Sequence, residues 1–148
     1  MAGLFAQDIG VAIEKEFGVD EIVIENGGDV YLNLKREAII SIYAGDSPLS
    51  EKVGLKIEPE DTPLGICTSS GTVGHSLSFG QADAVVIVCK DACLADTYAT
   101  AFANQIQEGA DIYPVLQKIS SVFDILGAVV IVGDGLGIRG RFCLVPLE

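Results

Sequence analysis

The chain has 148 residues, of which 49 % are hydrophobic and 20 % charged, enough for one folded domain with a substantial core. Its 9 basic and 21 acidic residues give a formal net charge of −12, which argues against binding to nucleic acid or to an anionic membrane, because both need basic groups. No apolar run reaches the roughly 18 residues of a membrane-spanning helix, and the N-terminus lacks the basic residues of a secretory signal. We therefore expect a soluble, cytoplasmic protein.

The first half of the chain predicts one helix followed by a series of strands. Apolar residues recur at helical spacing over 3–17, and Gly18 is a typical helix stop. The dipeptide Asn26-Gly27 lies between two β-rich runs and is a strong hairpin signal, since both turn positions favour positive φ. The strands are expected at 21–25, 30–34, 38–43, 53–57 and 64–68.

The second half predicts a buried strand, two helices and closing strands. Residues 84–89 form a continuous apolar run, which is typical of a central strand. Asp91 is suited to cap a helix over 92–107, and a second helix is expected at 114–123. The last strands are expected at 128–132 and 138–145, with a turn at Asp134-Gly135. This order predicts an α+β fold, a single domain over residues 1–148 with helices packed on a largely antiparallel sheet.

Common nucleotide and metal motifs are absent or stand in the wrong context. Gly133-Asp-Gly-Leu-Gly137 resembles a dinucleotide loop, but β-like residues follow where a helix should begin. A Gly-Lys-Ser/Thr triplet is missing. The four cysteines form no CxxC pair, and one histidine cannot complete a zinc set, so reduced thiols are expected at Cys67, Cys89, Cys93 and Cys143.

The loop over 68–76 is rich in hydroxyl side chains and glycine. Backbone amides beside Gly71 and Gly74 could approach an anion, and His75 titrates near neutral pH. The candidate phosphate-binding residues are Ser69, Ser70, Gly71 and Thr72, followed by His75 as the candidate catalytic residue. An ordinary tight loop, with His75 bonded to backbone, is the alternative. A serine hydrolase using Ser69 or Ser70 with His75 is a further one, although no Gly-x-Ser-x-Gly elbow is present.

Asp96 and Thr100 are four residues apart, so both project from one face of the expected helix. A carboxylate and a hydroxyl are hard oxygen donors that suit Mg²⁺, with phosphate oxygens completing its shell. A solvated helix face is the alternative interpretation.

Three segments occur in one order that resembles the ApbE superfamily, the FAD:protein FMN transferases. They are Glu25-Asn-Gly-Gly-Asp-Val30, Ile66-Cys-Thr-Ser-Ser-Gly71 and Leu94-Ala-Asp-Thr-Tyr-Ala-Thr-Ala-Phe102. The Cys-Thr-Ser-Ser-Gly-Thr-Val-Gly-His-Ser string is most similar to a short, uncharacterised branch of that superfamily.

The resemblance implies an ApbE-like fold and a flavin-handling function. Asp96 and Thr100 match the residues that hold Mg²⁺ in the transferases, and Asp29 becomes a candidate cofactor-binding residue. The implied cofactors are FAD or FMN with Mg²⁺, and the implied reaction passes FMN to a hydroxyl group of a protein substrate.

The resemblance also implies that an N-terminal portion is missing, because the transferases carry a segment ahead of the first helix. The apolar surface left uncovered would favour a homo-oligomer. We therefore expect an ApbE-like protein that binds a phosphorylated ligand, such as a flavin nucleotide, with Mg²⁺ and with flavin nucleotidyl transferase-like activity as the enzymatic possibility. The alternative is a non-catalytic accessory protein, or a sulfur-assimilation factor that uses an exposed, low-pKa thiol at Cys67.

Overall fold

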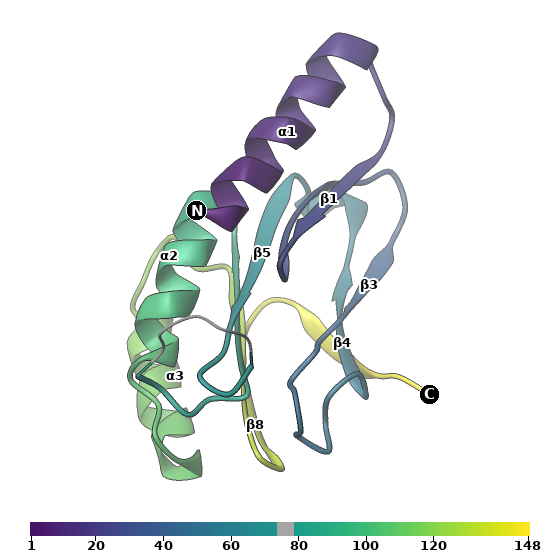
Figure 1. Ribbon diagram of the computed structural model, residues 1–148. Helices are drawn as coiled ribbons and strands as arrows, with labels where there is room; N and C mark the ends of the chain where they lie inside the picture. The colour runs from purple at the N-terminus through teal and green to yellow at the C-terminus, as the bar shows by residue number, and fades with distance from the viewer. Residues whose placement is uncertain (74–78) are drawn as a thin grey trace.

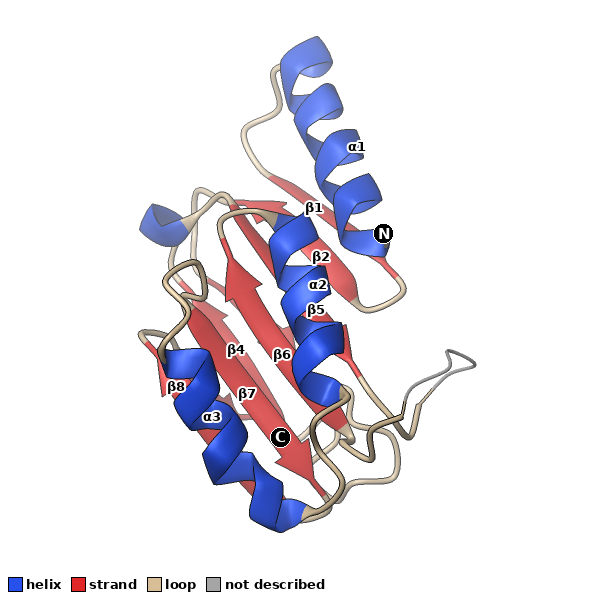
Figure 2. Cartoon of the chain, turned by 90° about the vertical axis from the view of Figure 1, so that its left-hand side faces the viewer, coloured by secondary structure: helices blue, strands red, loops and turns tan. Residues whose placement is uncertain are grey.

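The computed structural model describes residues 1–73 and 79–148, and its elements form three layers (Figure 1). Three helices cover one face of a six-stranded sheet, and a three-stranded sheet lies against the other face (Figures 1 and 2). The helices are α1 (Ala2–Phe17), α2 (Ala92–Ala103) and α3 (Ile112–Ser120). Short 3-10 turns span Pro59–Asp61 and Gly109–Asp111.

Every strand pairing in both sheets is antiparallel. The large sheet has the order β1-β2-β5-β6-β7-β8 and the small one the order β3-β4-β9. The strands of the large sheet are β1 (Ile22–Asn26), β2 (Asp29–Asn33), β5 (Leu64–Ser69), β6 (Ala84–Cys89), β7 (Gly127–Val132) and β8 (Gly135–Gly140). Those of the small sheet are β3 (Ala38–Ser41), β4 (Val53–Ile57) and β9 (Cys143–Pro146). The predicted α+β class with a largely antiparallel sheet is confirmed.

The central strands are apolar throughout because they are covered on both faces. In β6, alternate side chains enter two separate cores. Val85 and Ile87 pack under the helices, whereas Val86 and Val88 pack against the small sheet. All four are buried, and such burial contributes about 1.5–3 kcal/mol for each large apolar side chain.

Helix α1 lies over β1 and β2 and projects past the edge of the sheet (Figure 2). Its contact with β2 depends on Gly10, since a Cβ there would lie 2.3 Å from the Tyr31 ring. The Tyr31 hydroxyl donates a hydrogen bond to Glu14, at 3.3 Å. Gly18 ends the helix in the left-handed conformation, with φ 61°, as its position predicted.

Helix α2 begins as the sequence predicts but ends earlier. The Asp91 carboxylate accepts a hydrogen bond from the Leu94 amide at 3.0 Å, which caps the helix. Beyond Ala103 the amides of Gln105 and Ile106 bond three residues back, so the last turn tightens instead of continuing to residue 107.

The expected strand over 138–145 is wrong, because the chain leaves one sheet and enters the other within it. Gly140 has φ 98°, and a Cβ there would lie 2.3 Å from the Leu126 carbonyl oxygen. The chain bends at this glycine, buries Phe142 between the sheets, and continues as β9 beside β4. Among the described residues, no helix combines the length and the apolar character needed to cross a bilayer.

Candidate functional site

A cleft of about 560 Å³ lies between the two sheets. Its walls are apolar side chains from both sheets, with Val30, Ile66 and Val86 on one side and Ile40, Ile42 and Leu55 on the other. The polar lining residues come from the β1–β2 turn, from the end of β3 and from the end of β5 with the residue after it, and together they form the mouth of the cleft. The polar and glycine residues there are Glu25, Gly27, Gly28, Ser41, Tyr43, Thr68, Ser69 and Ser70. A largely apolar hollow with convergent hydroxyl groups is typical of a small-molecule site.

One charged side chain lies on the described lining of the cleft. Among the described residues that line it, Glu25 is the only Asp, Glu, Lys, Arg or His. Its carboxylate accepts a hydrogen bond from the Gly28 amide at 2.8 Å, which holds it at the β1–β2 turn. A bare phosphate would therefore meet no positive side chain among the lining residues that the structure describes.

The loop after β5 is held by its own Ser70 hydroxyl. Ser70 Oγ donates to the Ala82 carbonyl and accepts from the amides of Thr72 and Val73 at 3.1 and 2.9 Å. The Gly71 amide donates to Ala82 O at 2.8 Å. Of the amides predicted to face an anion, those of Gly71, Thr72 and Val73 are thus bonded within the protein, and those beside Gly74 lie outside the described residues.

Position 71 requires glycine because its backbone lies close to the backbone of Gly80. A Cβ there would lie 1.7 Å from the carbonyl oxygen of Gly80, so a side chain would separate the two ends of the loop. Of the predicted phosphate-binding residues, Ser69 and Ser70 line the cleft.

Thr72 belongs to a polar network that joins three loops. Its hydroxyl donates to one Asp83 carboxylate oxygen at 2.7 Å, and the Gly133 amide donates to the other at 2.7 Å. Ser47, which is buried, donates to the Gly133 carbonyl at 2.6 Å and thereby ties in the β3–β4 loop. Asp83 therefore positions the loop after β5 against the β7–β8 turn.

Asp29 lies on the opposite face of the same sheet, beneath the helices. It pairs with Cys67 across β2 and β5, accepts a hydrogen bond from the Thr68 amide at 3.3 Å, and is only 5 % exposed. Burial, and then the negative charge of Asp96, raise its pKa from 3.8 to about 6. Asp29 is thus a carboxyl group that titrates near neutral pH.

Asp96 and Thr100 share a face of α2 but differ in surroundings. The Asp96 carboxylate is bonded to the Met1 ammonium group and to the Gly3 amide at the start of α1. Thr100 is exposed. Within the described ranges, no group of three or more His, Cys, Asp or Glu side chains is arranged to hold a metal ion. The assignment of Asp96 and Thr100 to Mg²⁺ therefore stays a prediction.

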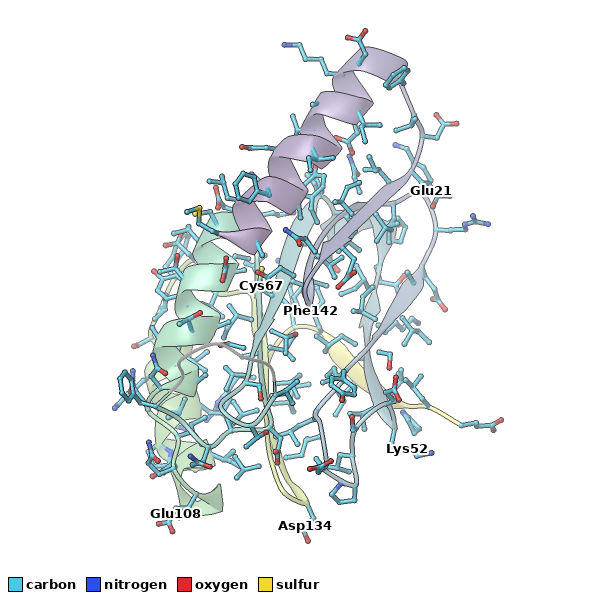
Figure 3. The ribbon with its side chains drawn as sticks, viewed as in Figure 1. Glu21, Lys52, Cys67, Glu108, Asp134 and Phe142 are labelled. Atoms are coloured by element: carbon cyan, nitrogen blue, oxygen red, sulfur yellow. The ribbon has the colours of Figure 1, made fainter. Side chains whose placement is uncertain are left out.

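Cys67 does not match the thiol that the sulfur-carrier alternative requires. It is fully buried beneath the first turn of α1, and its thiol donates to the Ala92 carbonyl at 3.3 Å (Figure 3). Burial, followed by the charge of Asp29, raises the thiol pKa, whereas a reactive cysteine needs an exposed thiol with a lowered pKa. The exposed thiol expected at Cys67 is therefore wrong.

His75 lies outside the described residues, so its predicted catalytic role and its pairing with Ser69 or Ser70 stay predictions. The β3 and β4 wall of the cleft, formed by Ile40, Ile42 and Leu55, was not predicted from the sequence. These residues carry the same alternating apolar pattern as ordinary core strands, so no sequence signal marks them.

The family model described as AbpE bacteria matches residues 1–118. Relatives named UPF0280 protein include one from Methanocella arvoryzae, 41 % identical over 124 residues, which cover 84 % of this chain and 50 % of the relative. The relative from Methanocaldococcus jannaschii is 41 % identical over 86 % of this chain and 54 % of its own length. That from Methanococcoides burtonii is 40 % identical over 95 % and 59 %. The chain spans about half the length of these relatives.

These matches overturn the resemblance to the ApbE superfamily of flavin transferases. The matching family is AbpE bacteria and the relatives are UPF0280 proteins, and neither finding connects the chain with flavin transfer. The short motifs that suggested the superfamily have structural uses here. Asn26 to Asp29 close a hairpin, and Ser70 and Gly71 hold a loop together.

Proposed function

The chain belongs to the AbpE bacteria family, and we propose that it binds a small organic molecule in the cleft between its two sheets. One observation carries the proposal, the cleft of about 560 Å³ with apolar walls and a hydroxyl-bearing mouth. Its volume falls in the range of about 300–1,000 Å³ that small-molecule sites occupy. The apolar body of the ligand would lie against Ile40, Leu55 and Val86.

The polar end of the ligand would lie at the mouth, near Thr68, Ser69 and Ser70. The Thr68 hydroxyl, on the same face of β5 as Ile66, can donate and accept hydrogen bonds there, whereas Ser70 Oγ is already bonded within the loop. The charged residue of the described lining, Glu25, is negative and repels phosphate. A phosphorylated ligand would therefore need to bring a divalent cation with it. Mg²⁺ suits this role, since it is commonly held by substrate phosphates and water with few protein ligands.

The finer proposal, FMN or FAD with Mg²⁺ held by Asp96 and Thr100, rests on the sequence motifs. Asp96 lies on the helix side, where it faces the start of α1, whereas the cleft lies on the side of the small sheet. We therefore place the cation with the ligand phosphate, and the proposal is binding without a catalytic step.

Calorimetric titration with flavins tests both parts of the proposal. Riboflavin supplies the apolar ring system without phosphate, FMN adds the phosphate, and FMN with EDTA removes free Mg²⁺. Binding of FMN that requires Mg²⁺ supports a cation carried with the phosphate. Binding of riboflavin but not of FMN keeps the cleft and withdraws the phosphorylated ligand.

Two adjacent isoleucines on β3 provide a matched pair of variants. Ile40 faces the cleft and Ile39, which is 47 % exposed, faces away from it. Ile40→Trp fills the cleft and is expected to weaken the flavin that binds by about tenfold or more, equivalent to about 1.4 kcal/mol. Ile39→Trp adds the same bulk outside and should leave affinity unchanged. Equal affinities in the two variants would show that the ligand binds elsewhere.

We also propose that the protein associates as a homo-oligomer, as the sequence suggested. The support is the set of exposed apolar side chains on α1, where Phe5 is 53 %, Ile9 49 % and Phe17 74 % exposed. Sedimentation of the chain and of Phe5→Glu tests this proposal, since the charge should shift the population toward monomer.

A further inference from the structure

We propose that Asn26, at the turn between β1 and β2, is a site of spontaneous deamidation. The β1–β2 turn consists of two glycines, Gly27 and Gly28, between the paired residues Asn26 and Asp29. An asparagine followed by glycine reacts readily because no side chain hinders the attack of the following amide nitrogen. The inference concerns the hairpin itself and does not rest on the proposed function.

The turn leaves the reacting atoms accessible. Asn26, Gly27 and Gly28 are all exposed, and nothing lies within 4 Å of the position that a Cβ of Gly27 would occupy. In the part of the chain that the structure describes, the Gly27 amide donates no hydrogen bond. The pairing of β1 with β2 ends at Asn26 and Asp29, so Gly27 lies in the turn beyond the last pair. The amide nitrogen is therefore open to solvent base.

The Asn26 side chain is weakly held. Its Nδ2 donates to the Ala2 carbonyl at 3.4 Å, a long hydrogen bond at an exposed position. Gly27 and Gly28 have φ values of 62° and 94°, and neither carries a Cβ that would resist rotation of the turn. Rotation about the Asn26 side-chain and Cα–C bonds must bring its Cγ to the Gly27 nitrogen, and neither glycine adds a side chain that would oppose this movement.

The reaction balances with water as the co-reactant. The Gly27 nitrogen gives its proton to solvent base and bonds to Asn26 Cγ, while the bond from Cγ to Nδ2 breaks and ammonia leaves. The resulting succinimide takes up one water at either carbonyl and opens to aspartate or isoaspartate. Either product places a carboxylate next to the Ala2 carbonyl at the start of α1, where the Asn26 amide donates a hydrogen bond in this structure.

The full-length folded chain, kept in mildly alkaline buffer, provides the test. Peptide mapping by mass spectrometry follows Asn26, with Asn33 and Asn104 as internal controls that precede Leu34 and Gln105. We expect Asn26 to convert about tenfold faster than either control or more, which needs only about 1.4 kcal/mol of difference in barrier. An isoaspartate-specific methyltransferase should label the product.

A variant and an unfolded sample complete the experiment. Asn26→Gln removes the five-membered ring and should abolish the acidic species of the folded chain. The same incubation in urea gives the rate for the unfolded chain. The inference is overturned if Asn26 converts in urea but not in the folded chain, or if Asn33 and Asn104 convert as fast as Asn26.

Discussion

Replacement of Asp29 by asparagine should stabilise the folded protein at alkaline pH. Asp29 is 5 % exposed, and burial together with the charge of Asp96 raises its pKa from 3.8 to about 6. The folded state therefore holds this proton more tightly than the unfolded state. Asp29 favours folding while it is protonated, and the advantage is lost as the pH rises through 3.8 to about 6.

The size of the effect follows from the shift. About two pKa units, at about 1.4 kcal/mol each, make ionised Asp29 cost the folded state about 3 kcal/mol well above pH 6. Asparagine keeps an oxygen for the Thr68 amide, but its NH2 group replaces a carboxylate oxygen at a buried position. The expected net gain in the free energy of unfolding is therefore about 2 kcal/mol at alkaline pH and close to zero or negative at acidic pH.

Urea unfolding measures this difference when it is run about two pH units above and about two below the pKa of Asp29. Asp8→Asn, which removes an exposed carboxylate of α1, is the control for a change in net charge alone. A pH-independent difference between wild type and Asp29→Asn would refute the argument. A variant that is less stable at alkaline pH would show that the Asp29 charge supports the fold.

Further substitutions test other parts of the structure. Gly65→Ala should destabilise the protein by several kcal/mol, because a Cβ at Gly65 would lie 2.3 Å from Ala92 Cα; thermal unfolding shows this, and an unchanged midpoint would contradict the packing of α2. Asp83→Ala should cost about 2 kcal/mol by leaving the Thr72 hydroxyl and the Gly133 amide without their partner; urea unfolding reports it. In the folded chain, iodoacetamide should modify the exposed Cys143 and spare Cys67 until urea is added; labelling of Cys67 at the rate of Cys143 would contradict its burial.

Local sequence signals were reliable where neighbours in the chain decide the structure. Asn26-Gly27 marked a hairpin, Asp91 a helix start and Gly18 a helix end, and all three were confirmed. The prediction of one strand over 138–145 was wrong, because the chain there divides into the end of β8 and β9. The bend between them depends on the close approach of Gly140 to Leu126, which lies earlier in the chain.

The candidate site was only partly visible in the sequence for the same reason. The hydroxyl loop led to Ser69 and Ser70, which line the cleft. The opposite wall is built from residues that look like ordinary core. The coupling of Asp29 to Asp96 exists because β2 pairs with β5 beneath α2, and the spacing of the two residues gives no sign of it.

The place of β9 in the small sheet bears on the order in which the protein matures during synthesis. β9 follows every other strand, and it pairs with β4, whose Leu55 forms part of the cleft wall. While residues 143–146 remain in the ribosomal exit tunnel, the nascent chain can form the β3–β4 hairpin but cannot close its free edge. The wall of the cleft that carries Leu55 is therefore completed only after residues 143–146 have been synthesised and have paired with β4.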